Sequence, residues 1–133
     1  MRILRQSPLF PYILIPLYLI SLKSYAQQSP RDYCKKGNEK VKSKNYDGAF
    51  DDFNKALKLD PKYAPAYNGR GLVKTEQNNL EGAIKDFDMA IKLMPNYADA
   101  YKNRGFAKYK KGDNVNSKHD FDRFLQLKPN IGE

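Results

Sequence analysis

The two side chains best suited to covalent or acid–base chemistry, Cys34 and His119, each occur once in the sequence. A cysteine nucleophile needs its base within hydrogen-bond reach, and these residues lie far apart along the chain. His119 stands between Lys118 and Asp120, so we interpret it as a solvated surface residue. The sequence also has no cluster of metal ligands and no glycine-rich phosphate loop. We therefore predict no catalytic residues, no enzymatic activity, no metal site and no cofactor.

Cys34 has two interpretations. A single cysteine cannot form a disulfide within the chain, so in an oxidising compartment the fold must depend on packing alone. One interpretation is a small, buried, apolar side chain on a helix. The other is a reactive thiol, or one that pairs with a second chain.

Pairs of opposite charge recur at a constant separation of 16 residues. The pairs are Lys36 with Asp52, Arg70 with Asp86, and Arg104 with Asp120. The spacing favours a structural contact between two successive helices over a catalytic arrangement. If these pairs are exposed, each contributes only about 0 to 1 kcal/mol to stability.

The same pairs belong to a repeat of 34 residues. At this shift the chain aligns with itself at proline, phenylalanine, tyrosine, glycine and aspartate, for example at Pro61, Pro95 and Pro129. Three copies result, at residues 30–63, 64–97 and 98–131. A fixed period of this length is typical of stacked supersecondary units.

Each copy predicts two helices. In the second copy, apolar residues recur at steps of three and four from Leu80 to Ile91, which gives one apolar stripe on a helix. Asn45, Asn79 and Asp113 precede the second helices as N-caps, and Gly71 allows a close helix approach. We expect first helices at 32–44, 64–77 and 98–111, and second helices at 46–59, 80–93 and 115–128. The predicted fold is all-α, a solenoid of three stacked helix-turn-helix hairpins.

This pattern of an aromatic and a small residue in the first helix, then alanine, an aromatic, alanine and a closing proline in the second, resembles the tetratricopeptide repeat. The third copy departs from it. Ser117 and Phe124 replace alanines, while Asn114 and Lys118 replace aliphatic residues. The resemblance also implies a capping helix after the last repeat, and only NIGE follows Pro129. A self-capped monomer and a weak homodimer through this end stay open.

Charge points to the binding face. The predicted first helices sum to a net charge of +8, and the second helices to −1. The resemblance implies that the first helices line a concave, peptide-binding groove. An acidic, extended polypeptide with some apolar side chains suits the basic and apolar residues expected there. These groove residues are Lys35, Asn38, Lys42, Leu72, Lys102, Asn103, Phe106, Tyr109 and Lys110.

The family's clamp for a C-terminal carboxylate does not carry over. Asn38 occupies one of its places, but Cys34 stands at the first lysine position and Gly69 at the second-repeat asparagine position. Asp99 takes another basic place. We therefore do not expect a chaperone C-terminus as the ligand.

The first 26 residues predict a signal peptide. Arg2 and Arg5 precede a run without charge from Leu9 to Leu22, and Ser24 and Ala26 form a small-residue cleavage site. The run is shorter than the roughly 20 residues needed to span a bilayer. We expect a mature domain, residues 27–133, that begins at Gln27, has a net charge of +6, stays free of the membrane after cleavage and is periplasmic or secreted.

Three function classes fit these observations. The leading one is an exported, non-enzymatic interaction module that binds a partner polypeptide in its groove. The alternative is a structural subunit of an oligomer or envelope complex that assembles through its C-terminal repeat. The third is adhesion of the basic face to an anionic surface. Nucleic acid as a partner conflicts with the signal peptide.

Overall fold

The structure is a computed structural model, and it describes residues 27–128. The predicted signal peptide, residues 1–26, lies outside the described residues, as does the end of the third repeat. Within them the chain forms helices and no strands, so the predicted all-α class is confirmed. The helices are α2 (Pro30–Lys42), α3 (Tyr46–Leu59), α4 (Ala64–Glu76), α5 (Leu80–Leu93), α6 (Ala98–Lys111) and α7 (Asn114–Leu127). None of these is long and apolar enough to cross a membrane.

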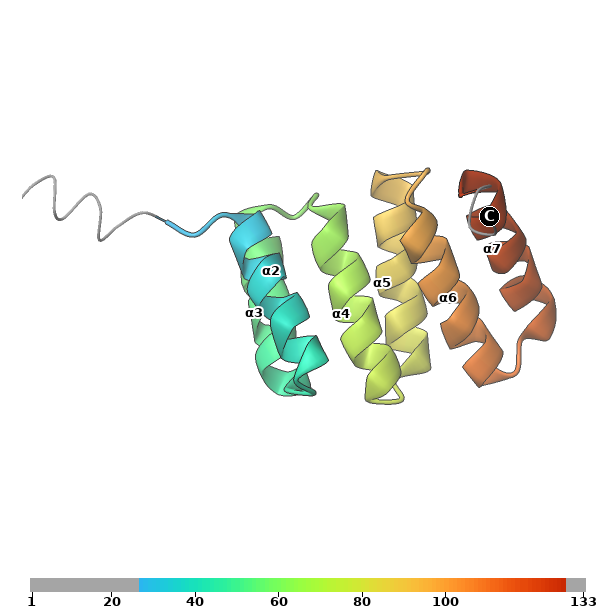
Figure 1. Ribbon diagram of the computed structural model, residues 1–133, viewed down its shortest axis with the longest axis horizontal. Helices are drawn as coiled ribbons and strands as arrows, with labels where there is room; N and C mark the ends of the chain where they lie inside the picture. The colour runs from blue at the N-terminus through green and yellow to red at the C-terminus, as the bar shows by residue number, and fades with distance from the viewer. Residues whose placement is uncertain (1–26, 129–133) are drawn as a thin grey trace, which may run out of the picture.

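The hairpins follow one another in chain order along the long axis of the molecule, with α2 and α3 at one end and α7 at the other (Figure 1). The helices pack as the hairpins α2–α3, α4–α5 and α6–α7, and each hairpin contacts the next. The first helices also touch one another, α2 with α4 and α4 with α6. The three hairpins therefore form the predicted stack.

Local signals set the helix ends. The Asn45, Asn79 and Asp113 side chains accept from backbone N–H groups of the first turns, so the predicted N-caps are confirmed. Lys44, Asn78 and Gly112, at equivalent places in the turns between paired helices, have positive φ angles of 60°, 61° and 91°. Left-handed backbone therefore follows each first helix at the same point of the repeat.

The helix α2 begins two residues before the predicted start. Ser29 accepts from the Asp32 N–H, and the Asp32 carboxylate accepts from the Ser29 N–H, which forms a capping box. Pro30 follows at the first helical position, where its missing N–H costs nothing. Because of these signals Arg31 lies within α2, although the predicted helix began at residue 32.

One phenylalanine per hairpin fills the core of the first two repeats. Phe53 and Phe87 are fully buried, as are the alanines on either side of them in their helices. The Phe87 ring packs on Gly71, where an added Cβ would lie 2.6 Å from the ring, so the predicted close approach at this glycine is confirmed. Small residues thus let the helices approach around each ring.

Two of the three predicted ion pairs are confirmed. Arg70 donates two hydrogen bonds to Asp86, at 2.9 and 2.7 Å, and Arg104 does the same to Asp120, at 2.9 and 2.6 Å. The second nitrogen arm of each arginine also reaches back to the preceding repeat, to Asn54 and Asp88. Each guanidinium therefore joins two hairpins.

The prediction that Lys36 pairs with Asp52 in the first repeat was wrong. Asp52 pairs with Lys40, one turn beyond Lys36, at 2.6 Å, while the Lys36 ammonium lies 6.0 Å from the centre of the Tyr33 ring. Equivalent lysines, Lys74 and Lys108, contact Asp86 and Asp120 in the later repeats. A lysine ammonium cannot donate two parallel hydrogen bonds to a carboxylate as a guanidinium does. Lys36 therefore does not reproduce the contact that Arg70 makes with Asp86.

The aspartates of these pairs are also buried, whereas the small contribution to stability given above applies to exposed pairs. Asp52, Asp86 and Asp120 are all buried, and Asp120 is fully inaccessible. Burial alone raises the pKa of the Asp120 carboxyl, but hydrogen bonds from Arg104 and Lys108 outweigh it and hold the pKa below its ordinary value. Each of these aspartates forms a buried charge cluster with its basic partners. The energetics of exposed ion pairs do not apply to such clusters.

Candidate binding groove

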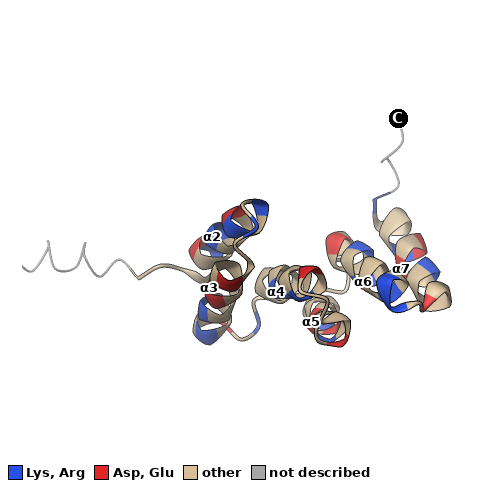
Figure 2. Ribbon diagram, turned by 90° about the horizontal axis from the view of Figure 1, so that it is seen from below, with Lys and Arg blue, Asp and Glu red and all other residues tan. Residues whose placement is uncertain are grey.

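The nine predicted groove residues lie on the three first helices, which the structure places in contact. Asn103 donates to Asn68 at 3.0 Å, between α6 and α4. We call this contact between successive first helices the α4–α6 step. The Lys110 ammonium donates to the Thr75 carbonyl across the same step at 3.4 Å. In Figure 2, blue segments mark basic residues on α2 and α6, whereas α4 between them is drawn mostly in tan.

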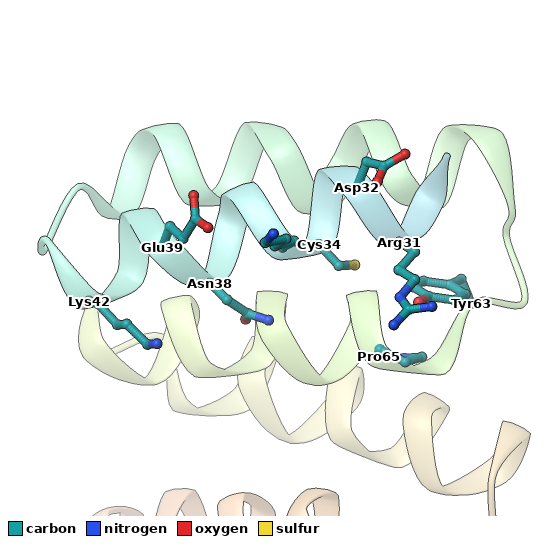
Figure 3. A pocket seen from close by; sticks show the side chains of 9 residues that line it. Arg31, Asp32, Cys34, Asn38, Glu39, Lys42, Tyr63 and Pro65 are labelled. Atoms are coloured by element: carbon teal, nitrogen blue, oxygen red, sulfur yellow. The ribbon is translucent and has the colours of Figure 1, made fainter. Parts of the chain in front are cut away.

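Three of the nine residues, Lys35, Asn38 and Lys42, line one pocket between α2 and the start of α4 (Figure 3). The pocket has a volume of about 690 Å³. Sequence analysis did not assign its other lining residues to a site. They are Arg31, Asp32, Cys34, Glu39, Tyr63 and Pro65.

The other predicted residues have different surroundings. Leu72 is half-buried against a cluster that contains Phe87 and Ala107. Lys102 lies with its ammonium 5.6 Å from the centre of the Phe124 ring on α7. Phe106 and Tyr109 are 47% and 61% exposed.

The 34-residue register explains this division. Lys102, Phe106 and Tyr109 are equivalent to Asn68, Leu72 and Thr75, residues through which α4 contacts α6. On α6 the same positions lie on the side of the third repeat that faces away from α4, which we call the outer side. The nine residues therefore divide between the α2–α4 pocket, the α4–α6 step and this outer side.

The pocket opens because a side-chain bridge is missing at the first step. Between α4 and α6, Asn68 is hydrogen-bonded to both Asn103 and Tyr97. The equivalent places in α2 and α4 hold Cys34 and Gly69, and glycine has no side chain to form such a bridge. A larger residue at position 69 is disfavoured, because an added Cβ would lie 2.3 Å from the Phe53 ring, which would have to move.

Electrostatics favour the packing interpretation of Cys34. Its side chain is buried, and burial raises the pKa of the thiol to about 11. The thiol is therefore protonated and weakly nucleophilic near neutral pH. His119 is exposed on α7, at the far end of the stack from Cys34 (Figure 1). Among residues 27–128, no group of His, Cys, Asp and Glu side chains is arranged to hold a metal ion.

A model of the TPR repeat family matches residues 37–76 and 71–112 of the chain. Among curated proteins, none matches.

Several solved structures, two of them TPR domains by name, are similar over most of the chain. The first TPR of Spaghetti (RPAP3), bound to the HSP90 peptide SRMEEVD, is 28% identical, with a TM-score of 0.74 and coverage of 79% of this chain and 83% of that one. The Arabidopsis OM64 TPR domain is 25% identical, with a TM-score of 0.74 and coverage of 78% and 86%. MamA is 26% identical, with a TM-score of 0.69, and this chain aligns with 59% of its length.

Proposed function

Because the chain belongs to the tetratricopeptide repeat family, we propose that it is a non-enzymatic interaction module that binds an extended, acidic segment of a partner polypeptide along α2, α4 and α6. The observation that carries this proposal is which basic residues form ion pairs within the protein and which do not. Arg70, Lys74, Arg104 and Lys108 are held by buried aspartates. By contrast, Arg31, Lys35 and Lys42 border the pocket, and none of the three forms an ion pair within residues 27–128.

A relative solved with a bound peptide supports the same ligand class. The peptide in the RPAP3 complex, SRMEEVD, carries three acidic residues and a methionine. In this chain Asn38 matches one position of the carboxylate clamp, but three other positions hold Cys34, Gly69 and Asp99. We therefore propose an internal acidic segment as the ligand in place of a chain terminus.

Charge reversal tests the groove. Changing Lys35, Lys102 and Lys110 together to glutamate should abolish binding of an acidic peptide, because attraction becomes repulsion along the first helices. The matched control reverses Lys85 and Lys92, which are exposed on α5, and should leave binding nearly intact. Fluorescence anisotropy with a labelled acidic peptide measures both variants.

Equal losses in both variants would indicate a diffuse charge effect and contradict a groove. A protein that bound no peptide, but whose mass rose with concentration, would favour the alternative of a structural subunit. That alternative rests on the exposed apolar side chains of the third repeat, which are Phe106, Tyr109, Val115 and Leu125.

We further propose that the protein is exported, to the periplasm or the exterior, after removal of residues 1–26. N-terminal sequencing of the exported form is expected to begin at Gln27. An intact Met1, or a protein retained in membranes after an alkaline wash, would contradict cleavage.

A further inference from the structure

Building on the groove function proposed above, we propose that the α2–α4 pocket selects an internal segment of the partner in which one large apolar side chain is flanked on both sides by carboxylates. The pocket volume of about 690 Å³ lies within the roughly 300 to 1,000 Å³ typical of ligand pockets. It accommodates a bulky side chain together with neighbouring backbone.

The part of the pocket beside α4 is apolar. Cys34 is a buried, neutral thiol, and the Tyr63 ring and Pro65 lie where α4 begins (Figure 3). Contact with these groups removes an apolar ligand side chain from water, which is favourable in proportion to the area buried.

Basic side chains stand at both ends of the pocket. Arg31 is in the first turn of α2 and Lys42 is at its last residue, and Cys34 lies between them in Figure 3. Eleven residues of helix correspond to about 16 Å at 1.5 Å per residue. An extended peptide advances about 3.3 to 3.6 Å per residue, so carboxylates about five residues apart reach both ends. Cys34 is about 4.5 Å along the helix from Arg31 and about 12 Å from Lys42. An apolar residue over Cys34 is therefore about one residue from the first carboxylate and about four from the second.

Two carboxylates also line the pocket, and they differ. Asp32 is engaged, because it accepts from the Ser29 N–H and hydroxyl at 2.9 and 2.7 Å. Glu39 is exposed and repels an acidic ligand. Glu39→Gln is therefore expected to tighten binding two- to five-fold. Asp51→Asn, which removes an exposed carboxylate from α3, is the matched control and should change binding less than two-fold.

Peptide isomers test the order of the motif. The first peptide has about eleven residues, blocked ends, a central Phe, an Asp about one residue before it and an Asp about four residues after it. The second has the same composition with both acids on one side of the Phe, and the third has Ser in place of Phe. Isothermal titration with the full chain should show the first peptide binding at least ten-fold tighter than either of the others.

Cys34 provides two independent readouts. Cys34→Leu fills the pocket and should weaken binding of the first peptide at least ten-fold. Because Cys34→Leu could destabilise the fold, alkylation of the unmodified protein gives a second measure. A saturating amount of the first peptide should slow alkylation of the Cys34 thiol at least ten-fold.

The outcomes separate this inference from the groove proposal. Equal affinity for all acidic peptides, with Cys34 alkylation unchanged, would overturn the pocket motif and leave a groove that recognises charge alone. Failure of every peptide to bind would overturn both proposals. Tighter binding by peptides with a free C-terminus than by blocked peptides would contradict selection of an internal segment.

Discussion

Asp120→Asn is expected to lower the free energy of unfolding by about 3 kcal/mol, as removing one partner of a buried charge cluster does. Asp120 is fully inaccessible and lies 2.6 Å from the Arg104 guanidinium and 2.8 Å from the Lys108 ammonium. Removing its charge leaves two half-buried cations without their main partner, although Arg104 keeps Asp88. Urea unfolding of the parent and the variant measures the difference.

Asp122→Asn is the matched control on the same helix. The Asp122 side chain is 55% exposed, and its contact with Lys118 spans 3.5 Å. An exposed pair of this kind contributes about 0.5 kcal/mol or less. Equal, small losses in the two variants would contradict a stabilising role for the buried cluster.

The same contact gives stability a pH dependence. Because the pKa of Asp120 is lowered in the folded protein, its contribution is fully present above the unfolded pKa of about 4. It is lost as the pH falls through the folded pKa. The parent should therefore lose more stability between neutral and acidic pH than Asp120→Asn does.

Gly69→Ala is expected to destabilise the protein by about 1 to 3 kcal/mol, the usual cost of overpacking a core. The added methyl group would lie 2.3 Å from Cε1 of Phe53, a fully buried ring that must move. On an exposed helix the same substitution stabilises by about 0.5 to 1 kcal/mol. The sign of the change in thermal and urea unfolding therefore reports the contact.

Two further variants locate this effect. Gly105→Ala places its methyl group 3.2 Å from its nearest neighbours, so a smaller change is expected. Adding Phe53→Leu to Gly69→Ala should recover part of the loss beyond additivity, because the smaller side chain leaves room. Additive effects would show that the two positions do not touch.

The sequence by itself determined the helices and their stacking order. The bounds of α3 and α5 agree with the prediction because their signals are local, with an asparagine cap at one end and an apolar stripe of helical period between the ends. The 34-residue repeat then required the hairpins to stack, since one hairpin cannot bury its stripe alone. Even the error at α2 came from a local signal, the capping box of Ser29 and Asp32.

Only the tertiary structure decided which side chains meet across helices. Lys36 and Lys40 lie one turn apart on the same helix, and their spacing from Asp52 does not show which ammonium reaches the buried carboxylate. Nor does composition show that these aspartates are buried.

The pocket depended on the structure for the same reason. Cys34, Tyr63 and Pro65 are separated along the chain, and they line one pocket only because α2 packs against α4. Local sequence sets backbone conformation over a few residues. The shape and charge of a surface depend on side chains from neighbouring repeats, whose separation is fixed by the packing of buried rings such as Phe53.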